Sequence, residues 1–161
     1  MKRLLTLALV ALLGPAAFAF TSADAANLLF LKQEEKLARD VYQALNAKWH
    51  HPTFANIARS EQQHMSAVSN LLVRYRVPDT TPTAPGVFTI PALQALYDRL
   101  VAEGSLSLQD ALEVGVLVEE TDIDDIQGML DTTTDAPIRR VLTNLQNGSY
   151  NHLAAFNRAL Q

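Results

Sequence analysis

The sequence predicts an all-α protein, a bundle of four long helices with one long crossover that contains a short extra helix. In four separate stretches, apolar residues recur at spacings of three and four, which is typical of amphipathic helices. Two connections between these stretches are short, whereas the one over residues 77–91 is long and holds four prolines and four threonines. The chain has 161 residues, 48% of them hydrophobic, which is enough for one domain with a real core.

The first 19 residues are predicted to be a signal peptide, so the domain spans residues 20–161. A basic pair is followed by an apolar run over residues 4–13 and by small residues at −3 and −1 before Phe20, as in secretory signals. Cleavage after Ala25 and an uncleaved membrane anchor are the alternatives, although the run is short for a span. We therefore expect an exported protein, periplasmic or extracellular, with no stable membrane insertion after cleavage.

The composition argues against several classes of function. There is no cysteine, so the chain has no disulfide, no lipid attachment at its mature start and no thiolate metal site. Without the two basic residues of the signal peptide, 11 of the 13 lysines and arginines remain against 17 acidic residues, a formal charge of −6. No basic patch indicates a nucleic acid or an anionic membrane surface as a partner. Any metal must be held by oxygen and nitrogen ligands.

Helix signals divide the domain into its elements. The long helices are expected over about residues 25–48, 53–76, 107–130 and 136–160, and the short helix over about 91–103. Asp24 or Ser22 is the expected N-cap of the first helix, and Pro52 suits the opening turn of the second. His50 and His51, in the tight connection between them, are interpreted as loop residues because consecutive side chains diverge.

The first two long helices carry polar residues in their buried stripes. The first stripe runs through Leu31, Glu35, Ala38, Tyr42, Leu45 and Trp49. Lys36 lies off this stripe, and Glu34, one residue off it, either supports a site or faces solvent. The second stripe runs through Phe54, Ile57, Val68, Leu71 and Tyr75, and its continuation falls on Glu61 and His64. Because unpaired buried polar groups are costly, these residues need a partner such as a metal ion.

The last two long helices repeat the pattern. Glu119 interrupts an apolar stripe in the third helix, and Glu120 and Asp122 flank it as further candidate ligands. In the fourth helix His152 interrupts the stripe. Gly148, in the same stripe, weakens the helix by up to about 1 kcal/mol but leaves room for close packing or for a site.

Two antiparallel helix pairs joined by one long crossover have the connectivity of ferritin-like bundles. Glu35 lies about 14 residues before the first turn, and Glu61 and His64 lie about 9 to 12 residues after it, so these groups can meet at mid-bundle. Glu119 and His152 lie at similar depths around the second turn. The alternative is a bundle whose buried polar groups pair among themselves, for example Glu35 with His64.

Three runs of sequence carry a family resemblance: 34–42 (EEKLARDVY), 61–65 (EQQHM) and 151–156 (NHLAAF). They resemble rubrerythrin-like proteins and, more closely, an uncharacterised bacterial and archaeal family of ferritin-like proteins known only as a domain of unknown function. The resemblance covers about residues 27 to 160. It implies a ferritin-like fold and a di-iron carboxylate centre, but no known reaction.

The resemblance also implies roles for single residues. Glu35 matches the carboxylate of the first helix, Glu61 the bridging carboxylate and His64 its paired histidine. Glu119 matches the carboxylate of the third helix and His152 the histidine of the fourth. The departure is Ser149, where the family pattern has a second bridging carboxylate. Either Glu120 or Asp122 replaces that carboxylate, or the centre is lopsided, or one metal position is weak.

The function expected from these features is that of an exported redox protein with two irons per monomer, manganese and zinc being the alternatives. It would reduce peroxide or oxidise ferrous iron, with dioxygen or peroxide as partner and, as an enzyme, with an external electron donor. Tyr42, one heptad from Glu35, is the candidate electron relay, although a satisfied core tyrosine is the more frequent role. A non-catalytic metal-buffering or sensing bundle and a structural bundle with a decayed site are the alternatives. A homodimer is expected, and whether the chain is an oxidoreductase stays open.

Overall fold

The computed structural model describes residues 20–161, and within this range the protein is all-helical, with five helices and no strands, as predicted. The helices are α1 (Ser22–Trp49), α2 (Pro52–Arg74), α3 (Pro91–Gly104), α4 (Leu108–Thr132) and α5 (Ala136–Ala159). The predicted signal peptide, residues 1–19, lies outside the described residues. None of these five helices is long and apolar enough to cross a membrane.

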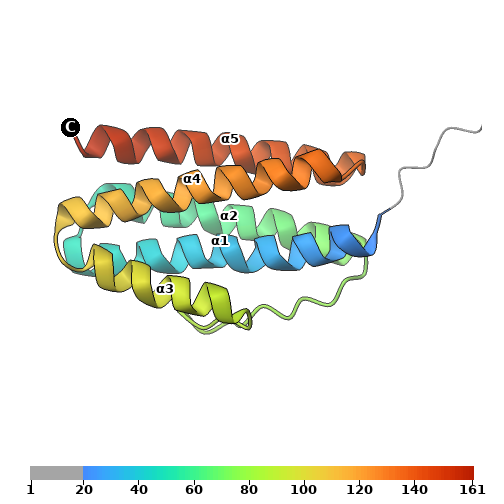
Figure 1. Cartoon of the computed structure of the whole chain (residues 1–161), viewed down its shortest axis with the longest axis horizontal. Helices are drawn as coiled ribbons and strands as arrows, with labels where there is room; N and C mark the ends of the chain where they lie inside the picture. Colours follow the sequence, from blue (N-terminus) through green and yellow to red (C-terminus); the bar gives the residue numbers. More distant parts are fainter. Residues whose placement is uncertain (1–19) are drawn as a thin grey trace, which may run out of the picture.

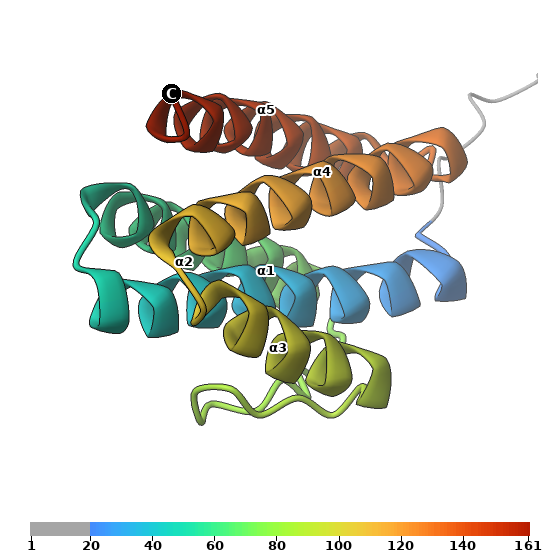
Figure 2. The same ribbon diagram turned by 60° about the vertical axis from the view of Figure 1, so that its left-hand side comes forward.

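The long helices form two antiparallel pairs, α1 with α2 and α4 with α5, and the pairs pack on one another (Figure 1). After α2, a long connection and α3 return the chain to the end of the bundle where α2 began, so α4 runs parallel to α2 (Figure 1). Turning the molecule shows that α3 lies outside the two pairs, against α1 and α4 (Figure 2).

Local capping explains where α1 begins and how the first turn is made. Helix α1 starts at Ser22, three residues before the expected position, because the side chain of Thr21 accepts from the backbone N–H of Asp24 in a capping box. The expected N-caps, Asp24 and Ser22, were therefore wrong. His50 ends α1 in the left-handed region, with φ of 51°, and His51 is the N-cap of α2.

The core consists of two apolar clusters, one towards each end of the bundle. Along α1, Leu31 belongs to one cluster and Leu37 and Val41 to the other. Each of the other long helices likewise passes from one cluster to the other. The polar residues that interrupted the predicted stripes lie at this change-over, and they form a buried polar layer between the clusters.

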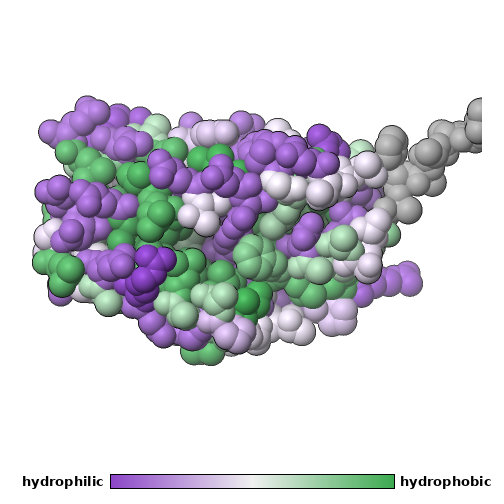
Figure 3. Space-filling model, in the orientation of Figure 1, coloured by the Kyte–Doolittle hydropathy of each residue, from purple (hydrophilic) through white to green (hydrophobic). Residues whose placement is uncertain are grey.

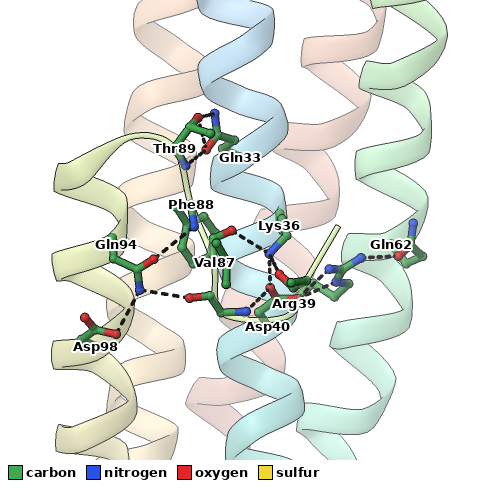
Figure 4. Close-up of polar contacts among 12 residues, drawn as sticks. Gln33, Lys36, Arg39, Asp40, Gln62, Val87, Phe88, Thr89, Gln94 and Asp98 are labelled. Atoms are coloured by element: carbon green, nitrogen blue, oxygen red, sulfur yellow. Dashed lines mark hydrogen bonds and ion pairs between the residues drawn. The ribbon is translucent and has the colours of Figure 1, made fainter. Parts of the chain in front are cut away.

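A buried lysine ties the long connection to α1 (Figure 4). Nζ of Lys36, which is 0% exposed, lies 2.5 Å from Oδ2 of Asp40 and donates to the carbonyl oxygens of Ala84 and Val87 at 2.9 and 3.2 Å. Asp40 in turn accepts from the backbone N–H of Gly86 at 2.9 Å. Lys36 lay off the predicted stripe, and it is buried because the connection covers that face of α1.

Candidate metal centre

The polar layer draws side chains from all four long helices. Its members are Glu35 from α1, Glu61 and His64 from α2, Glu119 and Asp122 from α4, and Ser149 and His152 from α5. All seven are at most 9% exposed. The layer exists because each helix carries these residues on the same stripe as its core residues, so packing the apolar positions brings the polar ones together.

Two groups of potential ligands share one carboxylate. Glu35, Glu61 and His64 form one group, and Glu61, Glu119 and His152 form the other, with the ligand atoms of each group within 4.8 Å of one another. Glu61 belongs to both groups. Each group could hold a metal ion, and the two groups share one carboxylate.

Both histidines present Nδ1 to the carboxylates. Nδ1 of His64 lies 2.8 Å from Oε2 of Glu61 and 3.1 Å from Oε2 of Glu35. Nδ1 of His152 lies 2.8 Å from the other oxygen of Glu61, Oε1, and 3.4 Å from Oε2 of Glu119. The two imidazole rings stack with their centroids 5.4 Å apart. Each oxygen of Glu61 therefore faces one imidazole.

Several of these atoms lack a hydrogen-bond partner among residues 20–161. They are Oε1 of Glu35, Oε1 of Glu61, Oδ1 of Asp122 and Nδ1 of His152. The 2.8 Å approach of His152 to Glu61 lacks hydrogen-bond geometry, so the two atoms do not satisfy one another. Glu35 and His64 do pair, as the alternative interpretation expected. Even so, this pairing leaves buried polar atoms unsatisfied, which costs of order 1–3 kcal/mol each.

The layer carries more potential negative charge than its histidines can neutralise. Burial and the charge of Glu61 raise the pKa of Glu119 to about 8, and burial, with Asp122 nearby, raises the pKa of Glu35 well above its usual range. Burial opposes ionisation of Glu61 as well, but His152 and His64 overcome it and hold its pKa at about 2. The remaining carboxyl groups must bind protons or a cation.

Asp122 faces Ser149, the position where the resemblance to ferritin-like proteins leads us to expect a carboxylate. Oγ of Ser149 donates to Oδ2 of Asp122 at 2.5 Å and lies 3.1 Å from the carbonyl oxygen of Leu145. Oδ1 of Asp122 is buried and has no partner among the described residues. Glu120, the other candidate replacement, is exposed and is not brought to the layer.

Hydrogen bonds from outside the two groups orient two of the potential ligands, Glu119 and His152. The hydroxyl of Tyr42 donates to Oε1 of Glu119 at 2.6 Å, which leaves Oε2 to face His152. Nε2 of His152 lies 2.9 Å from Oγ of Ser60. A ligating histidine is commonly held in this way through its second ring nitrogen. Sequence reasoning missed Ser60, because no pattern within α2 indicates that it faces α5.

Gly148 leaves room for His64. A methyl group at Gly148 would lie 2.6 Å from Nε2 and 2.8 Å from Cε1 of His64. The glycine in the α5 stripe therefore has a packing role, one of the two alternatives that the sequence left open. It lets the imidazole lie between α2 and α5.

Comparisons with known proteins identify relatives without a known activity. Residues 24–161 match the family of an uncharacterised protein domain, DUF2202. The uncharacterised protein MJ0754 of Methanocaldococcus jannaschii is 46% identical over 135 residues, which cover 83% of this chain and 73% of that protein. A crystal structure of the hypothetical protein MJ0754 from Methanococcus jannaschii DSM 2661 is similar with a TM-score of 0.87 and 41% sequence identity, covering 91% of this chain and 85% of that one.

Substituting Gly148→Ala should destabilise the protein, because the new methyl group collides with His64. We expect a loss of about 1–3 kcal/mol in the free energy of unfolding, as for overpacking in a core. Gly128→Ala is the matched control, since a methyl group there meets nothing within 4 Å. The free energy of unfolding of the control should rise by up to about 1 kcal/mol, because alanine has a higher helix propensity than glycine. Urea unfolding of the wild type and the two variants measures both effects. An equal rise in the free energy of unfolding for both variants would contradict the packing role of Gly148.

Asp122→Asn should stabilise the metal-free protein at high pH. Burial raises the pKa of Asp122 from 3.8 to about 7, so between these pH values the folded state binds this proton more tightly than the unfolded state. The contribution of Asp122 to the free energy of unfolding falls as the pH rises from about 4 to 7. Above pH 7 this contribution stays at its lowest value. At pH 8 the variant should be more stable than the wild type by roughly 2–4 kcal/mol.

The measurement is urea unfolding in the presence of a chelator at pH 4 and pH 8. The stability difference between Asp122→Asn and the wild type should shrink at pH 4, where the carboxyl group of Asp122 is neutral in the folded state and only about half ionised in the unfolded state. Asp124→Asn, an exposed position two residues along α4, should show no such change. A difference that is the same at both pH values would refute the assignment.

Proposed function

The chain belongs to the DUF2202 family of uncharacterised protein domains, and we propose that it is an exported, ferritin-like metal-binding protein with a di-iron carboxylate centre. The single observation that carries this proposal is the sharing of Glu61 between two buried ligand groups, each with a histidine and a second glutamate. If the buried polar side chains only paired with one another, the bundle would not need two such groups around one shared glutamate.

The donor atoms fit such a metal pair. Oxygen and imidazole nitrogen ligands suit iron and manganese, and zinc also accepts them. Glu35 and His64 would hold one ion, Glu119 and His152 the other, and Glu61 would bridge them. The unsatisfied atoms of Glu35, Glu61 and His152 are the ones that coordination would satisfy. When bound, two irons of this kind would take up electrons from ferrous iron or another donor and pass them to dioxygen or peroxide, by cycling between the ferrous and ferric states.

Asp122 is proposed as the replacement for the carboxylate absent at Ser149. Its contact with Ser149 brings a carboxyl group from α4 to the position that a longer side chain on α5 would otherwise fill. Its Oδ1 is free to act as a ligand. The centre is then asymmetric, with its additional carboxylate on α4.

The remaining parts of the proposal follow from the sequence. The ferritin-like relationship is supported by two antiparallel pairs joined by a crossover. Export rests on the predicted signal peptide, residues 1–19. An enzyme of this kind would take electrons from an external donor, since the chain has no cysteine to hold an iron–sulfur cluster. A homodimer remains the expected assembly.

Metal content tests the proposal. Protein purified from iron-supplemented cells should contain about two irons per chain, the number for one dinuclear centre. Glu61→Gln should lose both irons, because both ligand groups contain Glu61. Glu35→Gln and Glu119→Gln should each lose about one. Glu120→Gln, at the exposed neighbour of Glu119, is the matched control and should keep both.

Elemental analysis and circular dichroism of all five proteins separate the outcomes. A folded wild-type protein that binds no metal, or a Glu61→Gln variant that keeps its iron, would overturn the proposal. If the protein binds iron tightly and neither peroxide nor dioxygen oxidises the bound iron, it is a metal-buffering or sensing protein instead of an enzyme.

Tyr42 is proposed to relay an electron to the centre. Burial and the charges of Glu119 and Glu61 raise its pKa well above the ordinary value, so the ring keeps its proton, which it donates to Oε1 of Glu119. Tyr42→Phe should keep its iron but oxidise ferrous iron with peroxide slower by roughly tenfold or more, and a tyrosyl radical signal seen by electron paramagnetic resonance should disappear. Tyr150→Phe, at an exposed tyrosine, is the control. Unchanged oxidation in Tyr42→Phe would exclude the relay.

A further inference from the structure

A cavity of about 220 Å³ lies beside the polar layer, between α1, α3 and α4. Its walls are mainly apolar and include Leu37, Leu93, Leu96, Leu100 and Val118, with Leu117 at its exposed side. Apolar side chains also gather on the surface over α3 and the adjoining part of α4 (Figure 3). This cavity owes its existence to α3, the short helix that the crossover adds to the two pairs.

Two buried carboxyl groups line the same cavity. Glu34 is 8% exposed and Asp122 is 6% exposed. Oε2 of Glu34 and Oδ1 of Asp122 have no hydrogen-bond partner within residues 20–161. A buried acceptor without a donor is costly. The cavity therefore combines an apolar wall with two acceptors that lack a donor, as small-molecule sites commonly do.

We propose that the cavity binds a small neutral molecule with an apolar body and one hydroxyl group, which donates to Oε2 of Glu34. Its volume corresponds to about seven water molecules at 30 Å³ each, which suits a molecule the size of phenol. Arg99, an exposed cation that also lines the cavity, favours a neutral hydroxyl compound over an ammonium ion.

The cavity adjoins the candidate metal centre at two points. Glu34 precedes the ligand Glu35 in α1. Asp122 accepts from Ser149 inside the polar layer and also lines the cavity. A molecule bound here would lie next to the centre, so the cavity is placed to be its substrate site. This role rests on the proposed function, whereas binding of the molecule does not.

The test compares phenol with benzene, which has the same ring without the donor. Dissociation constants would be measured from amide chemical shifts of the full-length protein, both as purified and after chelation. Phenol should bind about tenfold tighter or more, the effect of one hydrogen bond to a charged or buried acceptor. Glu34→Met, which keeps the size of the side chain and removes the acceptor, should lose most of this preference and still bind benzene.

A second variant tests the location without altering a buried carboxyl group. Leu117→Trp, at a position 41% exposed on the cavity wall, should fill the entrance and weaken binding of both probes by at least about tenfold. Leu106→Trp is the matched control, because Leu106 is 77% exposed and lies outside the cavity. It should bind both probes as the wild type does.

The outcomes separate this inference from the proposed function. Equal affinity for phenol and benzene, or unchanged binding in Leu117→Trp, would overturn the inference whatever the metal content. Phenol binding that is selective and lost in Leu117→Trp would support it even in a protein that binds no iron. In that case only the proposed function would fail.

Discussion

The structure depends on burying a layer of charged and ionisable groups between two apolar clusters. Four carboxyl groups, those of Glu35, Glu61, Glu119 and Asp122, and two imidazoles lie at most 9% exposed around the same level of the bundle. Buried charges stabilise a fold less well than apolar residues of similar volume. The helices can keep this layer only if protons or cations neutralise it, which links the stability of the fold to occupancy of the site.

Glu61 is the centre of this arrangement, because each of its oxygens faces one histidine. The two halves around it are nevertheless unequal. Glu35 approaches His64 within hydrogen-bonding distance, whereas Glu119 is held by Tyr42 and His152 by Ser60. Ser149 and Asp122 add a further difference between α4 and α5. Two ions bound here would therefore have different surroundings and affinities.

The crossover does more than connect the two helix pairs. Its backbone is held by Lys36 and Asp40 of α1, and the side chain of Gln33 pairs with Thr89 just before α3 begins (Figure 4). These contacts hold α3 against α1, and α3 in turn closes the cavity beside Glu34 and Asp122. A network on the face of α1 that the crossover covers thus shapes the space next to the polar layer.

The sequence alone determined the helical class and the stripes that carry Glu35, Glu61, His64, Glu119 and His152, because both follow from spacing within a single helix. Spacing within one helix does not say which other helix, or which face of it, a given residue contacts. Only the tertiary structure decided that Lys36 is buried beneath the crossover, that Ser60 contacts His152, and that Asp122, not Glu120, meets Ser149. Each of these contacts joins residues far apart in the chain, so it depends on how the helices pack and not on their individual periodicity.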